Sequence, residues 1–230
     1  MNKKIRSFSF AGCAWHMAFH LGVGETIQKQ TNTENFSFFG ASSGALTALL
    51  LVAKVPSREC MNFLLSSCQK TEHRKLGPIG KMTGLVHSAL TELLPSHQEI
   101  DHNRLKISVT QALPLKNQLL PKGPIISKEE IIKIALASCY IPFYYERPVR
   151  IKSKIFVDGG LTDNLPFRDR IDTVTIAPYH KAKSHNIDIF PSLKPRYWHA
   201  VFPNKKALES LYADGQKAAA KFLARQNLTS

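Results

Sequence analysis

A glycine-flanked serine between an apolar strand pattern and a helical pattern most constrains the fold of this chain. Residues 36–46 read Phe-Ser-Phe-Phe-Gly-Ala-Ser-Ser-Gly-Ala-Leu, which predicts a strand over 36–39, a Gly-x-Ser-x-Gly turn and a helix. Gly40 and Gly44 would let the backbone turn sharply and let strand and helix approach closely. The motif alone is not specific, because small residues occur in many tight turns. Together with its flanks it predicts that Ser42 stands on a strained turn as a nucleophile.

A serine nucleophile needs a base within hydrogen-bonding distance, and Asp158 is one candidate. Residues 155–157 are typical of a buried strand end, and Asp158 is the first polar residue before the turn at Gly159 and Gly160. Such a carboxylate can face Ser42 directly. The alternative is that Asp-Gly-Gly is ordinary turn chemistry, with the aspartate bonded to its own backbone.

A three-residue site of the α/β-hydrolase type is the other possibility for the base. It would combine Ser42 with an acid such as Asp158 and one later histidine. The candidates for that histidine are His180, His185 and His199. Only one strand pattern, residues 5–10, precedes Ser42, whereas that fold places several strands before its nucleophile. The position of Ser42 therefore favours the two-residue site.

Small residues after the first strand pattern predict a third functional element. Residues 7–10 alternate like a strand, and Gly12, Cys13 and Ala14 follow before a helical pattern begins near residue 16. Backbone N–H groups that converge in such a loop bind anions. Acyl transfer needs this, because its tetrahedral intermediate carries an oxyanion. A nucleotide-binding loop is not favoured, since the chain has no complete Gly-x-Gly-x-x-Gly and no Walker lysine there.

These elements, in this order, resemble the patatin-like phospholipase family, and most closely its adipose triglyceride lipase and adiponutrin branch. The similar segments are residues 8–13, 20–23, 40–46, 138–144, 157–166, 175–178 and 212–223. The resemblance therefore covers essentially the whole chain.

The resemblance implies roles for the residues of these motifs. Ser42 would be the nucleophile, Asp158 the general base of a Ser-Asp dyad, and the amides of Gly12, Cys13 and Ala14 the oxyanion hole. The family hydrolyses ester bonds of acylglycerols or phospholipids through an acyl-serine intermediate, and some members pass the acyl group to another lipid. No metal or organic cofactor is implied.

The chain departs from the family pattern at three positions of the N-terminal loop. Ala14 and Met17 stand where the family usually has glycine, and His16 stands where the phospholipase branch often has a basic residue. A negative φ at Ala14 would leave the oxyanion hole intact. Met17 would narrow the acyl site or displace the loop. The alternative function is therefore a catalytically weak, lipid-binding pseudoenzyme of the same fold.

Length and periodicity predict one α/β domain over residues 1–230. The chain has 43% hydrophobic residues, and no linker or repeat interrupts it. We expect strands at 5–10, 36–39, 105–111, 154–157 and 172–177, and helices at 16–30, 43–54, 58–69, within 78–94, at 128–137 and at 205–225. This alternation predicts a mainly parallel sheet with helices on both faces, and the family resemblance implies a three-layer patatin-like fold.

The net charge of +14 predicts an anionic partner. Basic residues are spread along the chain without a nucleic-acid-binding motif, so nucleic acid is not expected. An anionic membrane or lipid droplet surface fits better, because a lipid esterase works at an interface. The aromatic residues expected to dock there are Tyr144, Tyr145, Tyr197 and Trp198, whereas Tyr140 and Phe143 are expected in the core.

Neither a membrane span nor a signal peptide is expected. The apolar run over residues 36–55 is interrupted by Gly40, Ser42 and Thr47, as in a buried strand followed by a helix. Residues 1–6 are basic, but no apolar core or cleavage site follows them. The cysteines at 13, 60, 68 and 139 form no C-x-x-C pair and are typical of reduced thiols. We therefore expect a cytoplasmic protein at a membrane or droplet surface, without a bound metal.

Overall fold

The computed structural model describes residues 4–125, 127–179, 181–182 and 185–227. Its main sheet has seven strands: β1 (Ser7–Phe10), β2 (Ser37–Ala41), β3 (Leu105–Gln111), β4 (Lys116–Leu120), β5 (Val149–Ile151), β6 (Lys154–Val157) and β7 (Thr173–Ile176). A separate pair consists of β8 (Lys181–Ala182) and β9 (His185–Asn186). The α-helices are α1 (Met17–Gln30), α2 (Ser43–Val52), α3 (Ser57–Glu72), α4 (Met82–Leu93), α5 (Lys128–Cys139), α6 (Gly160–Asp163), α7 (Trp198–Val201) and α8 (Lys205–Gln226). Short 3-10 turns are η1 (Ala14–His16), η2 (Thr33–Asn35), η3 (His97–Glu99) and η4 (His102–Arg104).

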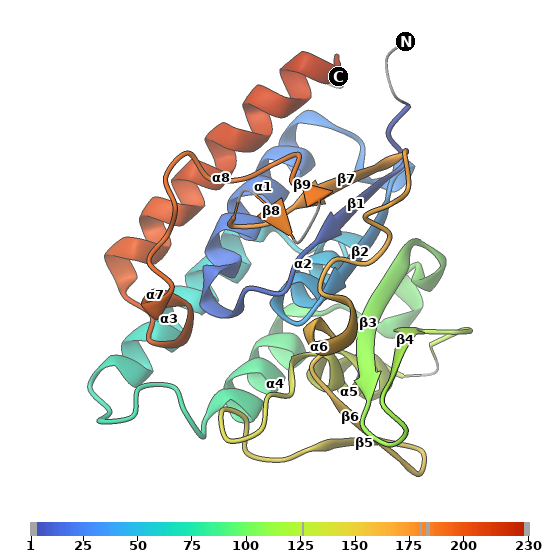
Figure 1. Ribbon diagram of the computed structural model, residues 1–230, viewed down its shortest axis with the longest axis vertical. Coiled ribbons are helices and arrows are strands. Elements are labelled where there is room, and N and C mark those ends of the chain that lie inside the picture. The colour runs from blue at the N-terminus through green and yellow to red at the C-terminus, as the bar shows by residue number, and fades with distance from the viewer. Residues whose placement is uncertain (1–3, 126, 180, 183–184, 228–230) are drawn as a thin grey trace.

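Four parallel strands form the centre of the sheet, in the order β7, β1, β2 and β3. Strands β4 and β6 pair antiparallel to β3, and β5 pairs antiparallel to β6. Every residue of β1 and β7 is buried, as expected of parallel strands covered on both faces. In Figure 1, α8 runs alongside α1 on one side of the molecule, and α4, α5 and the β5–β6 hairpin lie at the opposite end. The expected α/β architecture with helices on both sides is confirmed.

Aromatic side chains of β1 and β2 form the centre of the core. Phe8, Phe10 and Phe38 are fully buried, and the rings of Phe8 and Phe38 stack with centroids 5.8 Å apart. Burial of a large apolar side chain contributes about 1.5–3 kcal/mol, so these positions hold the strands that carry the loops described below.

Most predicted elements occur, with shifted ends. The predicted helix over 58–69 is α3, Ser57–Glu72, and one helix, α4, occupies the predicted region 78–94. Ser127 caps α5, since its Oγ accepts the Glu130 N–H at 3.1 Å. The sequence did not predict β4 and β5, because their short, partly polar stretches pair only where β3 and β6 present an open edge.

The apolar run over residues 36–55 is divided between β2 and α2, as expected. No helix within the described ranges is long and apolar enough to cross a membrane.

Candidate active site

Ser42 lies on the turn between β2 and α2, with φ of +53° and ψ of −129°. A serine rarely adopts such a positive φ, so the turn is strained. The Ser42 hydroxyl does not cap the helix, which leaves it available for chemistry. A Cβ on Gly40 would lie 2.3 Å from the carbonyl oxygen of Gly44. Gly40 therefore allows the strand and the helix to approach closely, whereas the positive φ occurs at Ser42 itself.

The end of α5 joins the turn that carries Ser42 to the turn that carries Asp158. The Ser42 N–H donates to Oγ of Ser138 at 2.8 Å, and that hydroxyl donates to the carbonyl of Ser108 at 2.6 Å. The N–H of Gly159 donates to the Ser138 carbonyl at 3.0 Å, so one residue holds both turns. Ser138 lies within a motif that the sequence singled out, but nothing in the pattern indicated this role.

The Asp158 carboxyl is held in a buried position beside Ser42. Its Oδ1 accepts the N–H of Gly160 at 2.7 Å, whereas its buried Oδ2 has no hydrogen-bond partner among the described residues. Burial raises the pKa of Asp158 to about 6, against the opposing effect of the Ser42 hydroxyl and the Gly160 N–H. The group is therefore ionised at neutral pH but is a stronger base than an exposed aspartate.

The N-terminal loop uses two of its three expected oxyanion donors for internal hydrogen bonds. The N–H of Gly12 donates to Oδ1 of Asn164 at 3.0 Å, and the N–H of Cys13 donates to Oγ of Ser43 at 3.0 Å. The N–H of Ala14 donates to no acceptor in the part of the chain that the structure describes. Only Ala14 of the three thus presents a free amide.

Ala14 has a φ of +50°, so the condition stated from the sequence for an intact oxyanion hole, a negative φ, is not met. The loop reverses direction here to enter η1, and a left-handed backbone angle suits glycine. An L-residue in this region costs about 1–2 kcal/mol, and the structure retains that strain. Met17, another of the three departures, lines the pocket described next.

An apolar pocket of about 790 Å³, including space open to solvent, begins at Ser42. It runs between η1 and the helices α2, α3 and α4. Its lining includes Trp15, Met17, Leu50, Met82, Val86 and Leu90. The apolar wall suits a hydrocarbon chain. No cluster of metal-ligating side chains occurs among residues 4–125, 127–179, 181–182 and 185–227.

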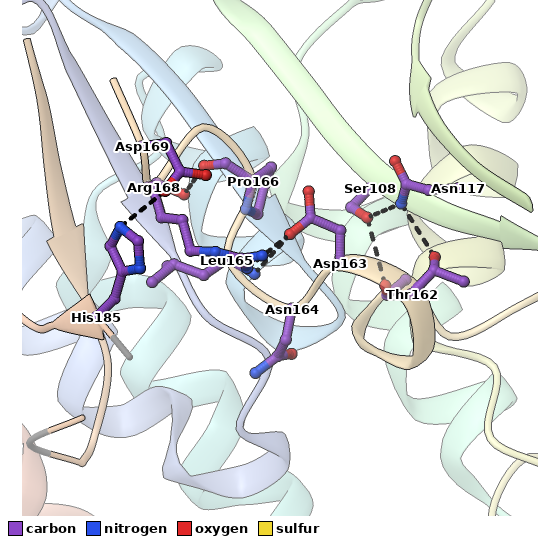
Figure 2. Close-up of polar contacts among 12 residues, drawn as sticks. Ser108, Asn117, Thr162, Asp163, Asn164, Leu165, Pro166, Arg168, Asp169 and His185 are labelled. Atoms are coloured by element: carbon purple, nitrogen blue, oxygen red, sulfur yellow. Dashed lines mark hydrogen bonds and ion pairs between the residues drawn. The ribbon is translucent and has the colours of Figure 1, made fainter. Parts of the chain in front are cut away.

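Asn164 is a site neighbour that sequence reasoning did not single out. Besides accepting from Gly12, its Nδ2 donates to the Gly12 carbonyl at 3.3 Å and to the Tyr179 hydroxyl at 2.9 Å. Figure 2 shows it on the segment after Asp158, between Asp163 and Leu165. One amide side chain thereby ties the N-terminal loop to the Asp158 turn.

The histidines considered for a triad do not join the site. His185 lies 2.8 Å from a carboxylate oxygen of Asp169, as Figure 2 shows. His199 lines a different cavity, and neither residue has a hydrogen bond to Ser42 or Asp158. His180 lies outside the described residues. The geometry thus supports the two-residue alternative.

The aromatic predictions are partly wrong. Phe143, expected in the core, is 94% exposed because the turn gives it a φ of +68° and directs it outward. Tyr145, expected on the surface, is only 8% exposed. Tyr197 and Trp198 are exposed, at 66% and 67%, as expected. Tyr144 is part-buried, and its hydroxyl accepts the Trp15 Nε1–H at 2.8 Å.

Comparison with known proteins supports a lipid-metabolising family. Residues 8–171 match the sequence profile described as "Patatin-like phospholipase". The chain is 31% identical to "Patatin-like phospholipase domain-containing protein 4" of Homo sapiens, over 96% of this chain and 97% of that protein. It is 29% identical to "1-acylglycerol-3-phosphate O-acyltransferase Pnpla3" of Mus musculus, over 86% of this chain and 49% of that protein.

A further relative, "Patatin-like phospholipase domain-containing protein 2" of Homo sapiens, is 28% identical over 98% of this chain and 50% of that protein. The chain thus spans about half the length of these two longer relatives. The fold is similar to that of VipD from Legionella pneumophila, with a TM-score of 0.58 and 13% identity over 97% of this chain and 67% of that one. The sequence profile covers most of this chain, and the chain belongs to the patatin-like phospholipase family.

Proposed function

We propose that this protein is a lipid acyl hydrolase that attacks an ester carbonyl with Ser42 and uses Asp158 as its general base. The observation that carries the proposal is a strained Ser42 that lines an apolar pocket and lies beside a buried carboxyl of raised pKa. Each part has a role in acyl transfer. The hydroxyl supplies the nucleophile, the carboxylate takes its proton and the pocket holds the acyl chain.

The reaction needs no histidine. Asp158 removes the Ser42 proton as Oγ bonds to the carbonyl carbon, and the tetrahedral intermediate collapses when the leaving alkoxide takes that proton. The product alcohol leaves and the acyl group stays on Ser42. Asp158 then deprotonates a water, and the water oxygen attacks the acyl carbon. The bond between the acyl carbon and Ser42 Oγ breaks as Oγ takes that proton from Asp158, which releases the fatty acid and restores both residues.

The oxyanion requires donors that are free in the resting protein. Ala14 supplies one on the N-terminal loop, and the amides of Ser43 and Gly44 at the start of α2 have no acceptor within the described segments. We infer that Gly12 and Cys13 position the loop through their internal hydrogen bonds, and that Ala14 donates to the oxyanion. The family resemblance implied that all three amides donate to the oxyanion, whereas we assign this role to Ala14 alone among the three.

The acyl group can also pass to a lipid hydroxyl in place of water. The mouse relative is named as an acyltransferase, and the pocket proposed to bind the acyl chain serves either acceptor. Acyl transfer is therefore included in the proposed function as a side activity on acylglycerols or phospholipids.

The alternative function is a lipid-binding pseudoenzyme, and the strained backbone of Ala14 is the observation that favours it. Labelling by a fluorophosphonate distinguishes the two functions. We expect the native chain to be labelled and Ser42→Ala to be unlabelled, with ester turnover lost in both Ser42→Ala and Asp158→Asn. Melting curves check that the variants are folded. A folded native chain that is neither labelled nor active would show the pseudoenzyme.

Contact with an anionic membrane or droplet surface is the proposed route to substrate. Phe143, Tyr197 and Trp198 project apolar surface, and the chain carries a net charge of +14. Sedimentation with phosphatidylcholine vesicles, with and without phosphatidylserine, measures this contact. We expect Phe143→Ser and Trp198→Ser to weaken binding to the anionic vesicles, and Leu113→Ser, at an 87% exposed position, to leave it unchanged. Equal binding of all variants would contradict the contact.

A further inference from the structure

A second cavity lies next to the N-terminal loop, on a different side of η1 from the apolar pocket. Ala14 and Trp15 line the apolar pocket, whereas the next residue, His16, lines the second cavity. Its other walls are the segment 192–199 and helix α8. The cavity measures about 890 Å³, including space open to solvent.

Most of the charged side chains that line this cavity are basic. Lys194, Arg196 and Lys217 form no ion pair within the described ranges. Nζ of Lys194 lies 4.9 Å from the centre of the Tyr197 ring. Both basic side chains of the segment 192–199 are exposed, so their charges can turn toward a ligand without breaking an ion pair.

Asp214 is the one acidic side chain among the described residues that line the cavity. Its carboxylate oxygens accept the N–H and the hydroxyl of Ser192, each at 2.9 Å. The carboxylate is therefore already occupied in holding the segment 192–199 against α8. Three cations against one hydrogen-bonded anion leave the cavity with a positive field.

His16 supplies an independent sign that the cavity takes a ligand. The residue is 3% exposed, and its Nε2 is buried without a hydrogen-bond partner among the described residues. Burial lowers the pKa of His16 to about 4, against a hydrogen bond to the backbone of Arg196 and with a smaller lowering by His199. The ring is thus neutral in the resting protein. A buried polar atom left unpaired costs about 1–3 kcal/mol, which a ligand could recover.

We propose that this cavity binds a phosphate group, with Lys194, Arg196 and Lys217 neutralising its charge and His16 hydrogen-bonding to it. A phosphate can interact with the three cationic side chains and also with the neutral His16 ring. Its anionic oxygens accept from the cations, with Arg196 able to offer two parallel donors, and its remaining O–H can donate to the neutral His16 ring. The source can be free phosphate or a lipid headgroup.

The consequence for the protein follows from the position of His16. Because His16 and Ala14 belong to the same 3-10 turn, a ligand on His16 would restrict the loop that carries the free Ala14 amide. The site is separate from the proposed ester chemistry, so phosphate binding would persist if that chemistry failed. Ser42→Ala should bind phosphate as the native chain does.

The test is a titration of the full chain with inorganic phosphate at constant ionic strength, following the histidine ring signals by NMR. His16→Gln identifies the His16 signal. We expect this signal to shift, and the double substitution Arg196→Gln with Lys217→Gln to raise the dissociation constant at least about tenfold, as loss of charge-assisted hydrogen bonds predicts. The matched control, Lys205→Gln with Lys206→Gln, removes two charges at the start of α8 and should change it less than about twofold.

Vesicles distinguish the two sources of phosphate. Phosphatidylcholine vesicles with and without phosphatidic acid are compared with inorganic phosphate on the same protein. A His16 response to inorganic phosphate supports a free anion, and a response only to phosphatidic acid supports a lipid headgroup. The absence of a His16 response to both, or equal weakening by the control pair, would overturn the proposal. Melting curves of each variant exclude misfolding as the cause.

Discussion

Ser42 and Asp158 are each the first residue after a strand that pairs with the same edge of β3, and the two strands point toward each other. The strand before Ser42 runs parallel to β3 and ends with Ala41 opposite Ser108. The strand before Asp158 runs antiparallel and ends with Val157 opposite Thr110. Strand β4 occupies the other edge of β3. Ser42 and Asp158 therefore lie at the same place beside β3, near its middle, although 116 positions separate them in the sequence.

The raised pKa of Asp158 predicts the pH dependence of turnover. The base acts only when ionised, so kcat/KM should rise about tenfold per pH unit below pH 6 and level off above it. The measurement is hydrolysis of a soluble short-chain ester from pH 4.5 to 8. A profile without a break near pH 6 would argue against Asp158 as the base.

Asp158→Asn should inactivate the protein and stabilise it at high pH. The folded state raises the pKa of this carboxyl from 3.8 to about 6, so the acid form favours folding, and that contribution is lost as the pH rises through 6. An amide carries no charge to bury, and we expect a gain of about 1–3 kcal/mol in the free energy of unfolding at pH 8. Urea unfolding measures it. The gain should vanish below pH 4, and a gain of equal size at both pH values would have another cause.

Ala14→Gly should relieve the strain of the N-terminal loop. At a φ of +50°, glycine avoids the Cβ penalty, and we expect about 1 kcal/mol of added stability together with faster turnover. Ala213→Gly, at an exposed helical position of α8, is the control and should destabilise by about 0.5–1 kcal/mol. If both substitutions destabilise equally, Ala14 is not strained.

Asn164→Ala should lower kcat more than it changes KM. The substitution removes both side-chain hydrogen bonds to the Gly12 peptide groups and leaves only the bond from the Gly12 N–H to the Asn164 backbone carbonyl, at 3.3 Å. We expect the displaced loop to lower kcat about 10- to 100-fold. Tyr179→Phe removes only the outer hydrogen bond to Asn164 and should cost much less. Steady-state kinetics on a soluble ester separate the two constants. A rise in KM with unchanged kcat would assign Asn164 to substrate binding.

Val86→Phe should shorten the acyl chain that the protein prefers. Val86 lines the apolar pocket, and a larger side chain there displaces methylene groups that each contribute about 0.8 kcal/mol when buried. The ratio of kcat/KM for a sixteen-carbon ester to that for a four-carbon ester should fall at least tenfold, since two such groups suffice. Thr91→Phe, on the exposed side of the same helix, should leave the ratio unchanged. An unchanged ratio in Val86→Phe would place the acyl chain elsewhere.

Local pattern was sufficient for much of the fold and for the identity of the candidate site residues. The apolar runs predicted β1 and β2, and the glycines around Ser42 predicted the turn, because these structures depend on burial and on steric contacts between neighbouring residues. The periodicity of α5 and its capping serine also lie within a few residues of each other. Such features can be predicted from the sequence because all the residues that determine them lie within one short segment.

Tertiary structure alone decided how those residues meet. The sequence could name Ser42 and Asp158, but pairing along β3 brings them together, and Ser138 hydrogen-bonds to both turns. The same holds for the positive φ of Ala14 and the outward turn of Phe143, which depend on packing against distant segments. A side chain's propensity is a property of its own neighbourhood, whereas the burial, backbone angle and pKa of a residue depend on atoms that the chain contributes from far away.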